Sequence, residues 1–370
     1  MNKSIVNRPS SIRQLFDSHA LWLSMLIGVL GYKWFTPFSP ILPWLIFFML
    51  FFTFCKVNPL DLRLHKWHWV VLALQLVLSF GVYAVIIKLT GDNVIAQGLL
   101  VCFIMPTATA APIIAGKLGG SIQNLTTFTL LSNLATSLVV PALFPLVYPA
   151  ADMTFWPAFL LILSRVSPLL LGPFLAAWLL RIAYNWYYQR KNLTANDSER
   201  SNSVSGLTTQ WSNSPQGGHK KEFVLPKRWA QTPFYLWVAS IIVLSAVVTG
   251  TIITYKSQIT KTTIIWLLAG SFFACLVQFG LGKLVGYKLP APGKGRDYQD
   301  VLVNPAAAPK TMEGVSSITA GQAFGQKNTS LGVWMAQTYL HPLSALGAAA
   351  YIIWQNIFNS LQLIVAAHKK

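Results

Sequence analysis

A polar segment near the C-terminal end of the chain contains the residues best suited to chemistry. It runs from Gly321 to Ser330 (GQAFGQKNTS) and interrupts a long apolar stretch. An unpaired lysine at bilayer depth costs roughly 2.5–3.5 kcal/mol, so Lys327 is expected to face a cavity rather than lipid. An ammonium and a carboxylate ~4 Å apart attract by about 4 kcal/mol at an effective dielectric constant of 20. The segment therefore predicts a binding site for a small organic anion.

A second interruption lies in the first half of the chain, at Met105–Pro112 (MPTATAAP). Its two prolines remove backbone hydrogen bonds and are expected to break a helix in mid-membrane. Broken helices in corresponding halves of a membrane protein are the best indication in a sequence of a transporter's binding site, so we expect the two segments to cross. The predicted substrate-binding residues are Pro106, Thr107, Thr109, Pro112, Gln326, Lys327, Asn328 and Thr329.

The composition is typical of a membrane protein. Hydrophobic residues make up 54% of the chain and charged residues only 10%, whereas soluble domains carry about 25% charge. The formal net charge is +18, but the basic residues form short clusters between apolar spans, which argues against nucleic-acid binding. Their distribution predicts that both termini are cytoplasmic, and the few cysteines suit a bacterial cytoplasmic (plasma) membrane. The expected partners are lipids and a small organic anion.

The apolar segments predict an all-α membrane protein with ten transmembrane helices. Two five-helix repeats must then have inverted topology, because five is odd, and the interrupted segments become crossing broken helices 4 and 9. The first repeat plus the sixth helix covers residues 1–183, a basic cytoplasmic linker predicted to be disordered covers 184–229, and the rest of the second repeat covers 230–370. The predicted spans are Leu21–Pro37, Ile41–Cys55, Trp67–Lys88, Val94–Gly116, Asn124–Tyr148, Phe155–Ile182, Phe234–Tyr255, Thr263–Val285, Met312–Thr338 and Pro342–Ala366.

Several further polar residues fall inside these spans. They either form interhelical hydrogen bonds, worth about 0.6–2 kcal/mol each, or contribute to an ion or polar site. Arg165 has the further alternative of extending from a helix end to the membrane surface. The spans contain no His, Asp or Glu constellation for acid–base catalysis or metal binding, so we expect no enzyme and no metal site. The candidates for an ion or polar site are Gln75, Thr129, Asn133, Arg165, Gln278 and Gln322.

Four motifs resemble the bile acid:sodium symporter family. They are GQKNTSLG (Gly325–Gly332), SALGAAAYIIWQNIFNSL (Ser344–Leu361), LVQFGLGKLVG (Leu276–Gly286) and SPLLLG in the sixth span. The resemblance covers nearly the whole chain except the linker. It implies a panel domain of helices at residues 21–55, 155–182 and 234–255, and a core domain at 67–148 and 263–366 that contains the crossing helices.

The sequence departs from this family at its sodium ligands. Gln75 matches a glutamine ligand of the family, and Thr129 and Asn133 fall near its hydroxyl ligands. However, the family's acidic ligand falls on Ala323, its motif glutamine falls on Lys327, and its Ser-Asn pair falls on Ala111 and Pro112. Sodium needs oxygen ligands, so a sodium ion stays an alternative only, and no cofactor is expected.

We therefore expect a secondary transporter that moves a small or amphipathic organic anion by alternating access, without the usual sodium sites, and that uses Lys327 as a fixed positive charge. A sodium- or proton-coupled symporter is an alternative, since a lysine desolvated in a cavity can lose its proton near neutral pH. A second alternative is a membrane receptor that binds a solute and no longer transports it.

Overall fold

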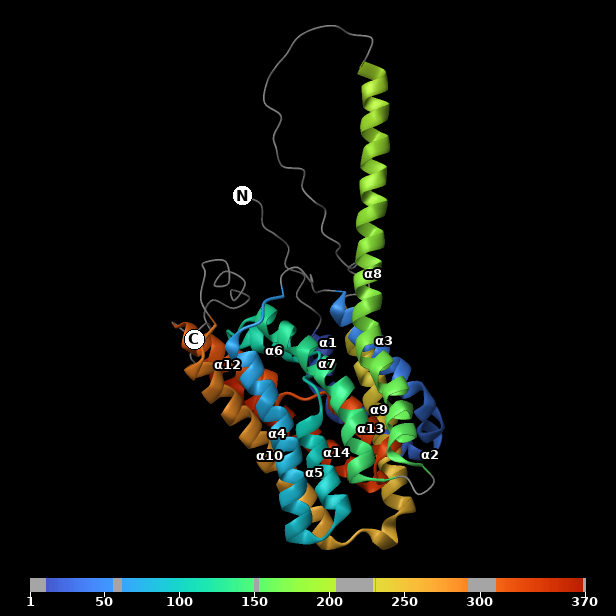
Figure 1. The fold of residues 1–370 in the computed structure, drawn as a ribbon, viewed down its shortest axis with the longest axis vertical. Coiled ribbons are helices and arrows are strands. Elements are labelled where there is room, and N and C mark those ends of the chain that lie inside the picture. The colour runs from blue at the N-terminus through green and yellow to red at the C-terminus, as the bar shows by residue number, and fades with distance from the viewer. Residues whose placement is uncertain are drawn as a thin grey trace.

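The computed structural model describes residues 11–55, 62–149, 153–203, 229, 231–291 and 311–368. Within these ranges the chain is helical and has no β-strand, apart from a single antiparallel bridge between Thr107 and Lys327. The helices pack into an elongated bundle, from one end of which α8 projects (Figure 1). An all-α architecture is therefore confirmed for the described residues.

The helices are separated along the chain by connections of very different length. In chain order they are α1 (Ser11–Leu30), α2 (Tyr32–Phe35), η1 (Thr36–Ile41), α3 (Leu42–Phe54), α4 (Lys66–Thr90), α5 (Asn93–Ile104), α6 (Ala111–Lys117), α7 (Ile122–Val147), α8 (Phe155–Ser203), α9 (Thr232–Thr254), η4 (Lys256–Gln258), α10 (Lys261–Lys288), α12 (Met312–Gly325), α13 (Thr329–Tyr339), η5 (Pro342–Ser344) and α14 (Ala345–His368).

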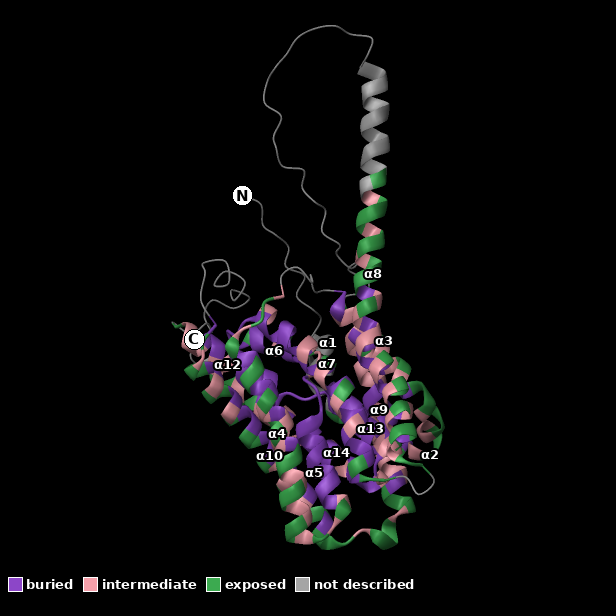
Figure 2. Cartoon of the chain, in the orientation of Figure 1, coloured by how far each residue is buried: buried purple, intermediate pink, exposed green. Residues whose placement is uncertain are grey.

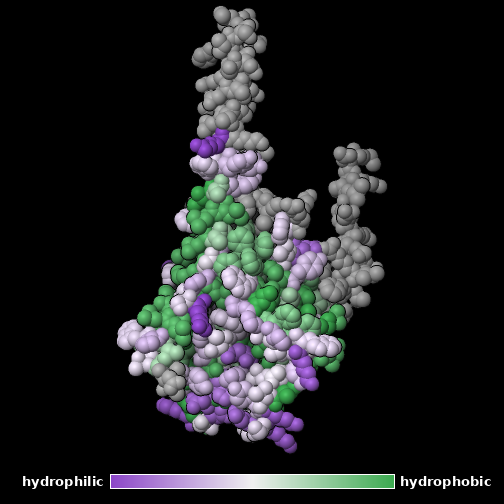
Figure 3. Space-filling model, turned by 90° about the vertical axis from the view of Figure 1, so that its right-hand side faces the viewer, coloured by the Kyte–Doolittle hydropathy of each residue, from purple (hydrophilic) through white to green (hydrophobic). Residues whose placement is uncertain are grey.

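In the described part of the chain, six helical segments are long and apolar enough to cross a membrane. They are Tyr32–Phe54, Lys66–Thr90, Ile122–Val147, Phe155–Tyr188, Thr232–Thr254 and Lys261–Lys288. Large apolar side chains also cover the outside of the bundle, where Trp34 is 80% and Leu30 is 76% exposed. Figure 3 shows hydrophobic residues over much of one face and hydrophilic residues gathered at the lower end. These features are compatible with an integral multi-pass membrane protein, for which lipid takes the place of water.

The chain leaves the helical conformation at both segments that the sequence singles out. Residues 105–110 separate α5 from α6, and residues 326–328 separate α12 from α13. The Ala108 N–H donates to the Gln326 carbonyl over 2.9 Å, and the Asn328 N–H donates to the Pro106 carbonyl over 2.8 Å. The two interruptions therefore run antiparallel and in contact. Figure 2 shows that the helices around this contact, α5 and α13 among them, are mostly buried.

Glycines allow the helices beside this contact to approach closely. A Cβ atom added at Gly286 of α10 would collide with the backbone carbonyl of Ser316 in α12, and one at Gly282 would meet the carbonyl of Ala320. Gly347 of α14 lies in the same way against the backbone of Gly98 in α5. Small residues at such positions let backbones pack tightly, which drives helix association where lipid offers no hydrophobic effect.

Two predictions from the sequence differ from the structure. The first span was expected at Leu21–Pro37, but the helix begins at Ser11 and ends at Leu30. The predicted linker at 184–229 is wrong in its first part, because α8 continues to Ser203; the segment contains no Gly or Pro between Pro173 and Gly206 that would end the helix. Residues 204–228 and 230 lie outside the described ranges. The ten-span inverted repeat and the panel and core domains stay predictions.

Gly286→Ala is expected to lower the thermal stability of the purified protein, since overpacking against a backbone group typically costs about 1–3 kcal/mol. Gly280→Ala, in the same helix, is the matched control because a Cβ there meets nothing within 4 Å. Melting temperatures of both variants in the same detergent would check this. Equal melting temperatures for the two variants would contradict the proposed close approach of α10 and α12.

Candidate functional site

A cavity of about 380 Å³ lies beside the contact between the two interruptions. Residues from α3, α6, α7, α9 and α14 line it together with both interruptions. Its apolar wall includes Met49, Pro112, Ile113, Trp237, Ile241 and Ile352, and its polar side includes Thr109, Gln326, Asn328, Thr329, Ser330 and Gln355. The volume falls within the range of about 300–1,000 Å³ that is usual for small-molecule sites.

The structure brings most of the predicted substrate-binding residues to this cavity. Thr109, Pro112, Gln326, Lys327, Asn328 and Thr329 line it, whereas Pro106 and Thr107 do not. Thr107 is fully buried, and its hydroxyl donates to the Ala323 carbonyl of α12 over 2.6 Å. Pro106 accepts the backbone bond from Asn328. These two residues therefore join the interruptions instead of facing a solute.

Lys327 lines the cavity, but its ammonium group points elsewhere. The residue is 1% exposed. Its Nζ donates to the Phe103 carbonyl over 3.1 Å and lies 5.0 Å from the centre of the Phe324 ring, and neither phenylalanine lines the cavity. Its backbone N–H donates to Gln355 Oε1 over 3.0 Å. The direct contact expected between this ammonium and a bound carboxylate is therefore not the arrangement found in this structure.

The carbonyl groups at the C-terminal end of α5 are capped by side chains from other helices. Lys327 and Gln278 reach the carbonyls of Phe103 and Cys102, over 3.1 and 3.2 Å. Gln75 of α4 donates to the next two carbonyls over 3.2 and 3.3 Å, and Thr136 of α7 also donates to the first of these. A buried backbone carbonyl without a partner is costly, and Pro106 supplies no N–H to continue the helix. The interruption is thus stabilised by donors from four separate elements.

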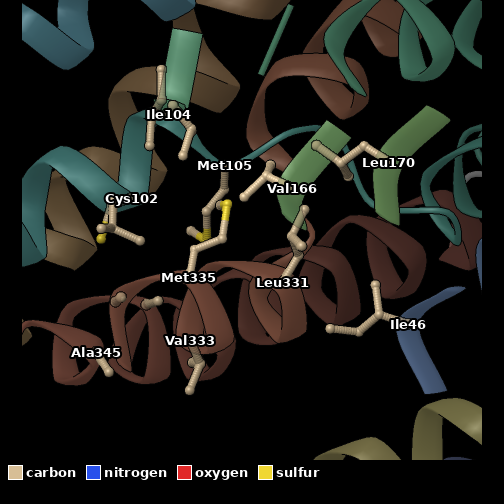
Figure 4. Close-up of a cluster of buried hydrophobic side chains, with 14 of the residues drawn as sticks. Ile46, Cys102, Ile104, Met105, Val166, Leu170, Leu331, Val333, Met335 and Ala345 are labelled. Carbon is tan, nitrogen blue, oxygen red and sulfur yellow. The ribbon is translucent and has the colours of Figure 1, made fainter. Parts of the chain in front are cut away.

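The apolar side of the crossing is packed between the same elements. Met105, which follows α5, lies beside Met335 of α13, with Leu331 on the same helix nearby (Figure 4). Gly332 leaves the space that the Met105 side chain occupies. This packing holds α13 against the end of α5 and so sets the position of the α13 N-terminus.

Two polar atoms at the cavity lack a hydrogen-bond partner. They are Nδ2 of Asn328 and Oε1 of Gln326, on side chains that are each 4% exposed. The other end of the Asn328 amide is used, because its Oδ1 caps α13 by accepting the Leu331 N–H over 3.2 Å. Buried polar groups are nearly always paired, so these two atoms hold hydrogen-bonding capacity that the described residues do not use.

The residues predicted for an ion or polar site are mostly engaged in hydrogen bonds between or within helices. Gln75 caps α5 and accepts from Ser132, and the Gln278 amide also reaches Tyr351. Thr129 and Asn133 bond within α7, and Gln322 donates to Gln362. Arg165 is exposed and lies beside Tyr339, away from the cavity. In the described part of the chain no group of three or more His, Cys, Asp or Glu residues is arranged to hold a metal ion.

Reasoning from the sequence missed the apolar wall of the cavity. Met49 and Trp237 come from α3 and α9, far along the chain from both interruptions. Neither residue is unusual in an apolar span, so nothing in the sequence distinguishes it from packing residues. Gln355, which also lines the cavity, was not among the predicted site residues. Gln355 lies four residues after Tyr351, so the two side chains share one face of α14. The Tyr351 hydroxyl donates to the Gly325 carbonyl over 2.8 Å, so this face lies beside the second interruption, which is visible only once the fold is known.

Comparison with known proteins does not assign this chain to a family. No protein-family model matches the sequence, and no curated protein matches it. The resemblance to the bile acid:sodium symporter family therefore rests on the motifs alone.

Gln75→Leu is expected to destabilise the protein by about 1–3 kcal/mol, because it leaves buried carbonyl groups at the end of α5 without one of their donors. Thermal melting in detergent would measure the loss. Gln258→Leu, at an exposed position in η4, is the control and should melt like the wild type. If Gln75→Leu also melts like the wild type, the capping of α5 does not contribute to stability.

Proposed function

We propose that this protein is a secondary transporter of small amphipathic organic anions, with ten spans in two inverted repeats. The observation that carries the proposal is the cavity at the meeting of two interrupted helices, which is lined by apolar side chains and by polar residues, two of which have an unpaired side-chain atom. Discontinuous helices that meet near the middle of the membrane are a common design of transporter sites. The resemblance to bile acid:sodium symporters supports the same class of function.

The polar end of the solute is proposed to bind at the N-terminus of α13. A helix N-terminus carries a partial positive charge and free N–H groups, which favour an anion. Asn328 Nδ2 adds a donor without a partner, and the Ser330 hydroxyl lies 3.5 Å from that of Ser240. None of the described residues that line the cavity is Asp or Glu. Lys327 is proposed to favour the anion through its charge and without direct contact, because its ammonium group donates to the Phe103 carbonyl.

The apolar part of the solute is proposed to lie between α3, α6 and α9. Met49, Ile113 and Trp237 supply this wall. Burial of apolar surface contributes about 25 cal/mol per Å², so a purely polar anion would gain little here. An amphipathic anion satisfies both sides of the cavity at once, which is the reason to prefer it to a small hydrophilic one.

Alternating access is supported by a difference between the two ends of α9 and α13: the cavity lies at one end, and a side-chain hydrogen bond joins the helices at the other. The cavity lies at their N-terminal ends, next to Trp237 and Thr329. At their C-terminal ends the hydroxyl of Thr251 and the amide of Gln337 are joined, with a 3.0 Å bond from Gln337 Nε2. Contacts such as this one would have to break for the cavity to open at the other end. Basic residues concentrate on the cytoplasmic side of membrane proteins. From their distribution in this chain we propose that the cavity end of α9 and α13 faces the cytoplasm.

A contact between two aromatic rings also lies at the C-terminal ends of α9 and α13. His341 follows α13, and its ring lies 5.5 Å from that of Tyr255 at the end of α9. Burial lowers the pKa of His341, and Asp92 acts in the opposite direction. The Nδ1 of this ring accepts the Leu343 N–H over 3.3 Å.

Asn328→Asp is expected to weaken anion binding while preserving the fold. Aspartate keeps the oxygen that caps α13, but it replaces the unpaired donor by a negative charge. Loss of a hydrogen bond to a charged group costs about 1.5–3 kcal/mol, roughly a ten- to hundredfold weaker affinity. Thermal stabilisation in nanodiscs by cholate, octanoate and octanesulfonate would measure it, with octanamide as a neutral probe. Unchanged stabilisation of the variant by these anions would contradict the proposed subsite.

Uptake of the anion that binds best is expected to continue when sodium is replaced by choline, because the candidate sodium ligands are engaged in hydrogen bonds or replaced. Proteoliposomes and counterflow exchange would measure transport. Strict dependence on sodium would contradict this coupling, and dependence on an imposed pH gradient would favour the proton-coupled alternative. Binding without exchange would favour a receptor.

A further inference from the structure

We propose that the Lys327 ammonium is a built-in cation that holds the C-terminal end of α5 against the interruption between α12 and α13. In this proposal it is a positioning residue and not a ligand of the solute. The inference is independent of the transported substrate, because it concerns how the crossing itself is held together. It also explains why a lysine is tolerated at a position surrounded by apolar helices.

The surroundings of the ammonium carry the first part of the argument. Lys327 is among the largest side chains of the described chain that are almost completely buried. Its Nζ has the Phe103 carbonyl as a hydrogen-bond partner and the face of Phe324 close by. Among the described residues no salt bridge to a carboxylate is formed by Lys327, and the acidic residue nearest to it in the sequence of this half of the chain is Glu313, in the first turn of α12. A buried cation without a carboxylate needs another source of negative potential.

The end of α5 supplies that potential. The C-terminus of a helix carries roughly half a negative charge, and its last carbonyl groups have no partner within the helix. The other donors at this end are neutral amides and a hydroxyl, from Gln75, Gln278 and Thr136. Among the described side chains that bond these carbonyls, Lys327 is therefore the only one with a charged head group. A cation near a helix C-terminus is stabilising, and more so in favourable partly buried geometries.

The remaining bonds of Lys327 show what the ammonium connects. Its backbone pairs with Thr107 in the antiparallel bridge, and its N–H is bound by Gln355 of α14. One residue thus links α5, the first interruption, the second interruption and α14. Removal of the charge would release the end of α5 from α12 while the backbone bridge stayed available. The charge is predicted to matter for the relative position of these elements more than for any local helix.

Lys327→Ala provides a specific test by chemical rescue. The substitution removes Cγ, Cδ, Cε and Nζ, and n-propylammonium contains the same three carbons and one nitrogen. We expect the variant to melt at a lower temperature than the wild type and to regain most of the loss in n-propylammonium chloride. Tetramethylammonium chloride, which has the charge without N–H donors, and 1-propanol, which has the shape without the charge, should not restore it. Wild type and Lys117→Ala, at an exposed lysine of α6, should respond to none of them.

Lys327→Met separates charge from volume. Methionine fills much of the same space without a positive group, so the variant should melt below the wild type and should not respond to n-propylammonium. A wild-type melting temperature for Lys327→Met would overturn the proposal, as would an equal response of Lys327→Ala to 1-propanol. If Lys327→Ala yields folded protein only when purified with n-propylammonium, the proposal is supported; if no additive restores it, the proposal fails. Because no solute is used, these outcomes do not depend on the transport assay.

Discussion

The structure depends on one constraint: backbone groups released by an interrupted helix must find partners where water and lipid supply none. Pro106 has no N–H, so the last carbonyls of α5 cannot be satisfied by continuing the helix. Donors from α4, α7, α10 and the second interruption take over this role. The two interruptions also satisfy each other through the Ala108 and Asn328 bonds. Each interruption is therefore tolerated because the other lies against it.

This mutual dependence explains the arrangement of the cavity. Once α5 ends and α13 begins at the same level, a helix C-terminus and a helix N-terminus lie close together with opposite partial charges. Lys327 occupies the negative side, and the N-terminus of α13, with Asn328 and Ser330, is left toward the cavity. The positions of negative and positive partial charge at the proposed site thus follow from which helix ends the backbone brings together. The apolar wall comes mainly from α3, α6 and α9, with Ile352 of α14.

The positions of the interruptions could be predicted from the sequence because they depend on residue type. Prolines and a run of polar residues inside apolar segments disrupt a helix wherever those segments lie. The direction of the Lys327 side chain could not be predicted, since it depends on which carbonyls α5 leaves free at its end. The directions of the Gln75 and Gln278 side chains could not be predicted either, because by residue type both were equally suited to an ion site. The extension of α8 was missed because polar composition was interpreted as disorder, although the segment contains no helix-breaking residue before Gly206.

The sequence by itself determined that apolar helices make up this protein and that two of its segments cannot stay helical. These properties are local: they depend on hydrophobicity over a span and on proline and glycine within it. Only the tertiary structure decided which polar groups pair with each other and which remain free, because a buried hydrogen bond requires both partners within about 3 Å. Such proximity joins residues as distant along the chain as Phe103 and Lys327, and local composition does not encode it.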